Sequence, residues 1–297
     1  MRAFFKYIIF IFLLVVSILS FLDYSFTKIY ENAKPRTKFQ YFRSLKNKKI
    51  DYIFLGSSRV DNTIVPVIIE KQTGKTAVNL GFQATKLGDV YTMLQLIKEY
   101  NIQTEKIFIQ VDYIFNLEDG YSTIMQHELM PFIRENKITK DYFERHFSAE
   151  KHLYYVPFFR YSYFDVKIGL RELLLNVANK ETNILKNKGF TGLQGNSFQH
   201  ANALPQEINT QNKYYDQIVA FACINKMPIV FFCAPFCKHT KNLNFMGKLK
   251  EKIPGLYDFS SALTDDKMFQ NCSHLNAEGA AYFSKNTIQK MLTDTKS

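Results

Sequence analysis

Beyond residue 49 the chain alternates short apolar runs with segments whose apolar residues recur at helical spacing. Most of the short runs are continuously apolar, which is typical of strands covered on both faces of a sheet. We expect strands at Asp51–Leu55, Ala77–Leu80, Lys106–Val111, Pro228–Cys233 and Gly255–Phe259, and helices at Asp89–Tyr100, Tyr214–Asn225 and Asn276–Leu292. Strands that alternate with helices favour a parallel sheet with right-handed crossovers, so the sequence predicts an α/β fold.

Residues 113–205 interrupt this rhythm with aromatic-rich helical patterns and a loop, Gly189–Leu204. We interpret them as an insertion rather than an independent domain. With 297 residues, of which 46% are hydrophobic and 22% charged, the chain is too apolar for a disordered one and long enough to bury a sizeable core. The sequence has no internal repeat and no low-complexity tract.

The amino terminus is strongly apolar. Lys6 is the only charged residue among the twenty from Ala3 to Leu22. A helix of that length spans roughly 30 Å, the thickness of the hydrocarbon core of a bilayer. We therefore expect residues 1–22 to form an uncleaved transmembrane anchor. A cleaved signal peptide is the alternative, but Ile18-Leu19-Ser20 is a poor cleavage site.

Residues 23–49 are polar and basic, and we expect them to form a stalk between the anchor and a domain at 50–297. The segment from Lys34 to Lys49 has no acidic residue, so it is either solvated or lies against anionic lipid headgroups. The net charge of +11 indicates an anionic neighbour, such as a membrane surface or an acidic glycan. We expect no nucleic-acid partner, because the anchor argues against one and no groove-reading motif is present.

Basic residues on both sides of the apolar run leave its orientation open. Arg2 and Lys6 precede it, and Lys28, Lys34 and Arg36 are the first of a basic series that follows it. The positive-inside rule therefore gives conflicting signals. The four cysteines form no C-x-x-C pair, and we expect neither a metal nor a cofactor.

A candidate nucleophile follows the first expected strand, which runs into Gly56-Ser57-Ser58-Arg59. Gly56 allows a tight turn, and a hydroxyl just beyond it is presented at the carboxyl edge of the sheet, where parallel α/β proteins bind ligands. The alternative is a serine that only caps the next helix.

A candidate base lies before the last expected helix, in Asn271-Cys272-Ser273-His274-Leu275. A histidine at a helix entrance, three residues after a carboxamide, can act as a general base held by its neighbour, or it can simply bond to the turn. The other histidines show no ligand spacing, and we expect them at the surface or in loops; they are His127, His146, His152, His200 and His239.

Together the two motifs resemble those of the SGNH (GDSL-like) hydrolase superfamily over about residues 50–293. The serine motif behind a membrane anchor is most similar to the envelope branch, which includes the D-alanine-transfer proteins of teichoic acid loci and the alginate-acetylation proteins. The resemblance implies a domain outside the cytoplasmic membrane, often beside a membrane-bound O-acyltransferase. We accordingly expect a three-layer, flavodoxin-like sheet of about five parallel strands, with a transmembrane helix in front and a helical insertion.

The resemblance also implies roles for particular residues. Ser58 would be the catalytic nucleophile and His274 its base, and Asn271 stands where the family has its catalytic acid. The backbone N–H groups of Ser58 and Ala84 would form the oxyanion hole, although the family usually has Gly at the position of Ala84. The family's Asn after the third strand is missing from Val111-Asp112-Tyr113-Ile114, and Asn116 or a loop amide is the candidate replacement.

Among the differences from the family's motifs, Asn271 in place of the catalytic acid has the largest expected effect on catalysis. An amide can orient an imidazole but supplies no negative charge, and in a serine protease the Asp to Asn change costs about 10⁴ in turnover. Asp265 or Asp266 is the candidate source of the missing charge.

These features predict an acyl ester hydrolase or O-acyltransferase that acts on an acylated envelope polysaccharide or another acyl donor. The motifs do not separate water from a sugar hydroxyl as the acceptor. The first alternative is a noncatalytic accessory protein that docks a membrane-bound O-acyltransferase, and the second is a structural envelope protein.

Cys237 lies just past an expected strand, and Cys272 lies two residues before His274, so both should approach the same edge of the sheet. In an oxidising exterior they can form a disulfide that stiffens the histidine loop; the alternative is two free thiols. We expect Cys223 and Cys233 to pack as small hydrophobic residues.

Overall fold

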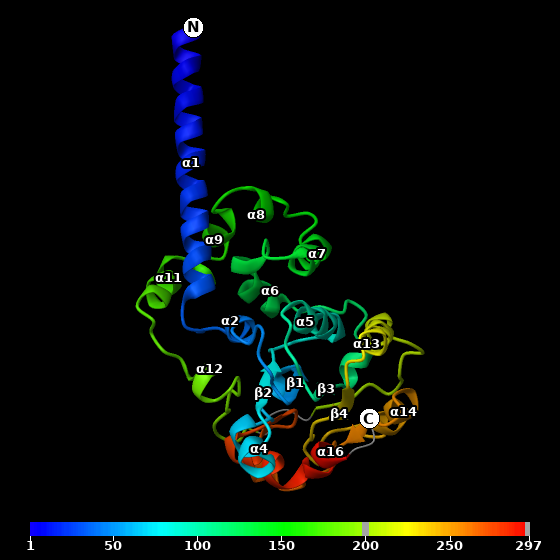
Figure 1. Ribbon diagram of the computed structural model, residues 1–297. Helices are drawn as coiled ribbons and strands as arrows, with labels where there is room; N and C mark the ends of the chain where they lie inside the picture. The colour runs from blue at the N-terminus through cyan, green and yellow to red at the C-terminus, as the bar shows by residue number, and fades with distance from the viewer. Residues whose placement is uncertain (198–201, 295–297) are drawn as a thin grey trace. The chain divides into compact units, whose positions relative to one another are not determined.

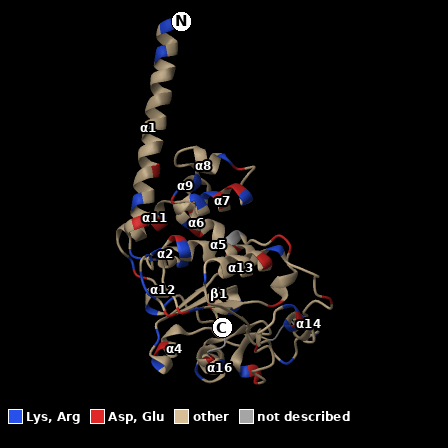
Figure 2. Ribbon diagram, turned by 45° about the vertical axis from the view of Figure 1, so that its right-hand side comes forward, with Lys and Arg blue, Asp and Glu red and all other residues tan. Residues whose placement is uncertain are grey.

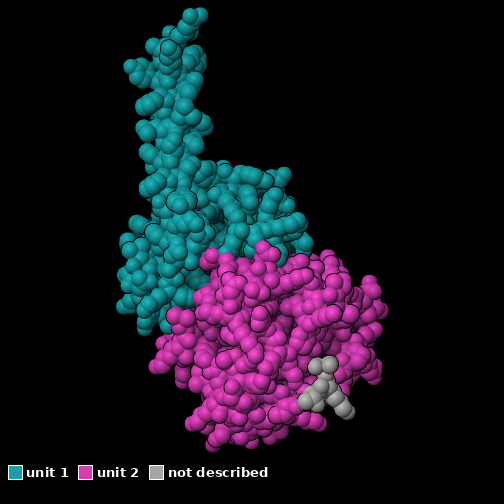
Figure 3. Space-filling model, viewed as in Figure 1, with its two compact units in different colours: residues 1–40, 126–182 teal, residues 41–125, 183–297 magenta. Residues whose placement is uncertain are grey.

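The computed structural model describes residues 1–197 and 202–294, and these form two compact units (Figure 3). Unit 1 comprises residues 1–40 and 126–182, and unit 2 comprises residues 41–125 and 183–297. Unit 2 contains the sheet and every candidate catalytic residue.

The sheet of unit 2 is parallel and has the strand order β2-β1-β3-β4-β5 (Figure 1). All five expected strands are present within two residues of their predicted bounds, as β1 (Tyr52–Gly56), β2 (Ala77–Gly81), β3 (Lys106–Gln110), β4 (Ile229–Cys233) and β5 (Tyr257–Asp258). The predicted α/β class with a five-stranded parallel sheet is therefore confirmed. A short antiparallel hairpin, β6 (Phe269–Asn271) and β7 (His274–Leu275), lies outside this sheet.

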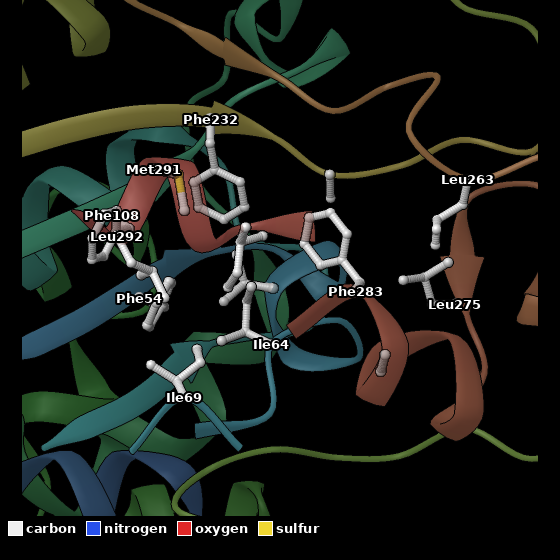
Figure 4. Packing of buried hydrophobic residues seen from close by; sticks show 14 of the residues in the cluster. Phe54, Ile64, Ile69, Phe108, Phe232, Leu263, Leu275, Phe283, Met291 and Leu292 are labelled. Atoms are coloured by element: carbon white, nitrogen blue, oxygen red, sulfur yellow. The ribbon is translucent and has the colours of Figure 1, made fainter. Parts of the chain in front are cut away.

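Consecutive residues of the central strands are buried, because side chains of a strand point alternately to its two faces and both faces are covered. On one face, Phe54, Phe108 and Phe232 from three neighbouring strands belong to a large apolar cluster. Figure 4 shows this cluster continuing through Phe283 to Leu275 of the hairpin. The strand that carries the candidate base is thereby anchored in the same core as the sheet.

Helices connect the strands of unit 2. They are α3 (Ser58–Asp61), α4 (Pro66–Thr73), α5 (Leu87–Glu99), α12 (Asn183–Lys186), α13 (Lys213–Ile224), α14 (Phe245–Lys252), α15 (Ala277–Tyr282) and α16 (Gln289–Thr293), with the 3₁₀ turns η1 (Tyr113–Asn116) and η3 (Asp266–Met268). The expected helices at 89–100 and 214–225 are confirmed as α5 and α13.

The expected single helix over Asn276–Leu292 is instead divided by a π-helical turn, η4 (Phe283–Thr287). The N–H of Ile288 bonds to the carbonyl of Phe283, which widens the turn. Phe283 and Ile288 are both completely buried in the apolar cluster, so the wider turn lets both side chains face the core.

Unit 1 is entirely helical in its described part. Its elements are α1 (Arg2–Asn32), η2 (Met130–Phe132), α7 (Lys137–His146), α8 (His152–Tyr155), α9 (Phe159–Tyr163), α10 (Asp165–Ile168) and α11 (Leu170–Val177); α2 (Lys38–Arg43) and α6 (Thr123–Leu129) cross the unit boundaries. Helix α1 is long and apolar enough to cross a membrane. Figure 2 shows it without charged residues over most of its length.

Residues 23–49, which we expected to form a stalk, are largely folded into the two units. Residues 23–32 complete α1, and α2 follows with Phe39 and Phe42 fully buried. Basic side chains of this segment are engaged as well, since Arg36 forms an ion pair of 2.6 Å with Glu172. The aromatic residues among the basic ones explain the difference, because their burial stabilises a folded segment.

The expected insertion at 113–205 is also narrower in the structure. Only residues 126–182 leave unit 2, and they combine with residues 1–40 to form unit 1. The described residues of 183–205 belong to unit 2. Residues 190–197, which are part of the expected loop, form neither helix nor strand.

Candidate active site

The turn after β1 presents Ser58 at the carboxyl edge of the sheet. A Cβ atom on Gly56 would lie 2.6 Å from Val60 Cγ2 and 2.8 Å from Gln110 Cβ, so only glycine fits there. Ser57 caps α3, since its Oγ accepts from the N–H of Arg59 and donates to Gln110 Oε1 at 2.8 Å. Ser58 is the first residue of α3 and is partly exposed, so its hydroxyl is free of the capping role.

His274 lies on the β6–β7 hairpin, where its register partner is Asn271. The two residues flank the turn residues Cys272 and Ser273, so the hairpin itself sets them side by side. Asn276 then caps α15 by accepting the N–H of Gly279.

The hairpin brings the candidate nucleophile and base together, although they are 216 positions apart. The distance from Ser58 Oγ to His274 Nε2 is 2.7 Å, and that from His274 Nδ1 to Asn271 Oδ1 is 3.0 Å. Both ends of the imidazole are therefore in hydrogen-bond contact, in the order serine, histidine, amide. This is the arrangement of a nucleophile, a base and a group that orients the base.

The amide of Asn271 has a defined orientation. The backbone N–H of Ser273 can only donate, and it lies 2.9 Å from Asn271 Oδ1. Nδ2 donates to Gln270 Oε1 on the other side. The oxygen therefore faces His274, so Nδ1 carries the proton and Nε2 accepts from the hydroxyl of Ser58. Asn271 thus holds the imidazole in the tautomer that a general base needs.

The surroundings of His274 disfavour the protonated form of its imidazole. Burial and, secondly, the guanidinium of Arg59 lower the pKa of His274 to about 4. The imidazole is consequently neutral at pH 7, and among the residues that the structure describes no carboxylate contacts it to stabilise an imidazolium.

The two acidic residues that we considered as a substitute are engaged elsewhere. Asp266 forms ion pairs with Lys238 at 2.9 Å and His239 at 3.1 Å, and Asp265 caps η3 through the N–H of Lys267. Neither carboxylate contacts the imidazole, so neither candidate supplies the missing charge by direct contact.

Arg59, directly after the candidate nucleophile Ser58, is a residue whose contribution to the site sequence reasoning missed. Its Nε lies 2.6 Å from the carboxylate of Asp112, and both side chains are almost completely buried. Burial raises the pKa of Asp112, and Arg59 counteracts that rise. The guanidinium also donates to the carbonyl oxygens of Ser273 and Ala234 and stacks 3.6 Å from the ring of Phe236.

Arg59 therefore ties the serine turn to the end of β3, the end of β4 and the histidine hairpin. Its position next to Ser58 was the only signal in the sequence.

Ala84, the second expected oxyanion donor, lies in the turn after β2. The turn begins beside the serine motif, since the N–H of Phe82 donates to the carbonyl of Gly56 at 3.0 Å. Ala84 has a φ of +56°, in the left-handed region that favours glycine. Asn116, considered as a third donor, donates instead to the carbonyl of Glu207 and accepts from the N–H of Asn209.

Of the two alternatives for Cys237 and Cys272, a disulfide or two free thiols, the structure has the disulfide. The N–H of Cys237 also donates to the carbonyl of Cys272. The bridge fixes the turn of the histidine hairpin to the segment after β4. Cys233 is buried as expected, but Cys223 is exposed, so the expectation that it packs in the core is wrong.

The other histidines have no role in this site among the described residues. His152 and His239 are exposed, whereas His127 and His146 are half-buried, and burial lowers the pKa of His146 to about 4. His200 lies outside the described residues. Within residues 1–197 and 202–294, no three His, Cys, Asp or Glu side chains group as metal ligands.

A scan against models of protein families finds none that matches this chain, and a search of curated proteins finds no similar sequence.

Proposed function

We propose that the chain is a membrane-anchored, SGNH-like acyl ester hydrolase or O-acyltransferase of cell-envelope polysaccharide. The strand order β2-β1-β3-β4-β5 supports a three-layer, flavodoxin-like arrangement, in which the order of strand addition reverses between β1 and β3. Ligands of such sheets bind at this switch point, beyond the carboxyl ends of the strands. Ser58 follows β1 at that edge.

In the first step, Ser58 Oγ attacks the carbonyl carbon of an ester, and its proton passes to His274 Nε2. The backbone N–H groups of Ser58 and Ala84 stabilise the tetrahedral oxyanion. As the intermediate collapses, the bond to the leaving alcohol breaks and His274 returns the proton to it. An acyl group on Ser58 remains.

In the second step, a hydroxyl acceptor gives its proton to His274 and attacks the acyl carbon. Ser58 leaves and takes the proton back. With water as acceptor the product is a carboxylic acid, and with a sugar hydroxyl it is a new ester. The apolar helix α1 would anchor the enzyme with its domain outside the cytoplasmic membrane, and a neighbouring membrane-bound O-acyltransferase would supply the acyl group.

The contact of 2.7 Å between Ser58 Oγ and His274 Nε2 carries this proposal. The test is covalent labelling of the purified full chain with a fluorophosphonate probe, together with hydrolysis of p-nitrophenyl acetate. We expect Ser58→Ala and His274→Ala each to abolish both signals.

Ser261→Ala is the matched control, because this serine is exposed and lies outside the site. Labelling that persists in Ser58→Ala, or activity that neither substitution changes, would refute the enzymatic proposal and leave the accessory function.

A further inference from the structure

Unit 1 contains a cavity of about 320 Å³ beside the part of α1 that follows its apolar run. Five residues of α1 line it, beginning with Ser20 near the end of the apolar run and ending with Lys28, together with Arg134, Pro157 and Arg160 from the rest of unit 1. The apolar run ends at Leu22. If α1 crosses a membrane, as the proposed function requires, this cavity lies at the level of the lipid headgroups.

The cavity has an excess of positive charge. Asp23 is its one carboxylate, and it accepts from Arg160 at 3.0 and 2.9 Å, from Arg134 at 3.1 Å and from the backbone N–H of Phe158 at 2.7 Å. Two guanidinium groups thus share a single negative charge. Lys28 adds a third cation, which forms an ion pair with Glu31.

Arg160 is only 1% exposed, and within the described residues its Nε has no hydrogen-bond partner. Burial and the neighbouring Arg160 lower the pKa of Arg134, which is the effect expected where positive charge is incompletely balanced. An anionic ligand in the cavity would compensate the remaining positive charge.

The surface of unit 1 around α1 is unusually apolar for a protein facing water. On α1 itself, Phe21 and Tyr24 are 68% and 62% exposed. Large apolar side chains are also exposed on the helices beside it: Tyr155, Val156, Phe159, Tyr163, Val166 and Leu170. Figures 1 and 2 both show α8 and α9 on the side of unit 1 from which the apolar part of α1 projects.

Basic residues accompany these apolar ones, since Lys151, Lys167 and Arg171 are exposed on the same segment. Exposed aromatic side chains with lysine and arginine around them are typical of protein surfaces at the boundary of a bilayer. Phe21 and Tyr24 extend the exposed apolar surface of the candidate span itself into this cavity region, which favours lipid over a protein as its neighbour.

We propose that unit 1 lies in the bilayer interface and that its cavity binds the phosphate group of an anionic phospholipid. Arg134 and Lys28 would contact the phosphate from the open side, and the buried Arg160 would act from below. The volume of the cavity is sufficient for the phosphate group of the phospholipid and part of the glycerol backbone to which it is attached. This inference requires α1 to span the membrane but does not require catalysis.

The experiment is native mass spectrometry of the full chain released from mixed phosphatidylglycerol and phosphatidylcholine nanodiscs. We expect the chain to retain phosphatidylglycerol preferentially, and Lys28→Gln with Arg134→Gln to weaken that retention about tenfold or more. Lys28→Gln alone, at the rim of the cavity, should weaken retention of phosphatidylglycerol to a smaller extent. This single variant provides the test if the double variant fails to fold. Lys137→Gln with Lys140→Gln is the matched control, because both lysines are exposed on α7 and do not line the cavity.

Equal retention of the two lipids, or equal loss in the control, would overturn the proposal. Displacement of the lipid by millimolar inorganic phosphate would identify a site for free phosphate and would also overturn it. Ser58→Ala should retain the lipid fully, so failure of the catalytic proposal and failure of this one give different results.

Discussion

Replacing Asn271 by Asp would put a carboxylate where the structure has an amide oxygen, 3.0 Å from His274 Nδ1. The negative charge would favour the imidazolium that forms when Ser58 gives up its proton, and it would oppose the effect of Arg59. The backbone N–H of Ser273 that now donates to Asn271 Oδ1 would donate equally well to a carboxylate. We therefore expect Asn271→Asp to raise both the pKa of His274 and the turnover rate.

The size of the effect follows from the pKa of His274. The difference between its ordinary value of 6.5 and about 4 corresponds to about 3 kcal/mol. A unit charge at this distance contributes roughly 5 kcal/mol at an effective dielectric constant of about 20, and desolvation of the new carboxylate removes part of it. Restoring the ordinary pKa would raise kcat by about 10- to 300-fold, depending on how fully the proton has moved in the transition state.

This gain is smaller than the factor of about 10⁴ in the serine protease, because there the amide also imposes the wrong tautomer. Here Asn271 Oδ1 already faces Nδ1.

The pH profile of p-nitrophenyl acetate hydrolysis tests the reasoning. In the native chain the imidazole is a free base down to a pH of about 4, so kcat/KM should fall only below that value. In Asn271→Asp the acid limb should move to about pH 6.5 or higher, and by pH 5 the gain should shrink roughly 30-fold. Asn202→Asp is the control, because its amide bonds to Ser273 Oγ and not to the imidazole. An unchanged rate and an unmoved acid limb in Asn271→Asp would refute the argument.

Three further predictions concern the stability of unit 2, measured as unfolding free energy in detergent. Cys237→Ser with Cys272→Ser should cost about 4 kcal/mol, since the bridge spans 35 residues, and reduction of the native chain should match it; a loss under 1 kcal/mol would contradict this. Ala84→Gly should stabilise the fold by up to about 1 kcal/mol at its positive φ, and a destabilised variant would contradict that. Arg59→Met should cost about 3–5 kcal/mol by leaving Asp112 buried and unpaired, and adding Asp112→Asn should recover part of the loss; equal losses would show that the charge of Asp112 is not the cause.

The strands and most helices of unit 2 could be predicted because their information is local. Mostly apolar runs of four to six residues, separated by helical periodicity, match the bounds of β1 to β5 within two residues. The pairing of Ser58 with His274 is not local, and the prediction depended on a resemblance in two short motifs. The two residues meet because Ser58 follows β1 at the carboxyl edge of the parallel sheet and the hairpin that carries His274 lies against that edge.

The unpredicted features depend on partners that only the tertiary structure brings together. Arg59 and Asp112 look like ordinary surface residues in the sequence, yet both are buried because they neutralise each other. The separation of residues 126–182 from unit 2 was not predicted, for a similar reason. The helices of this segment pack with the end of α1, where Arg160 and Asp23 are more than a hundred positions apart.

A catalytic acid in a serine triad has two tasks, and this site separates them. One task is to hold the imidazole in place and in the correct tautomer, and here Asn271 performs it on a hairpin fixed by the Cys237–Cys272 bridge and by Arg59. The other task is to stabilise the imidazolium, and Arg59 opposes it because its positive charge is close. Arg59 therefore helps to fix the hairpin that carries His274 and at the same time disfavours protonation of the imidazole. His274 stays unprotonated at a pH where a carboxylate-paired histidine would already be charged, so under the proposed function we expect both slow turnover at neutral pH and continued activity in acid.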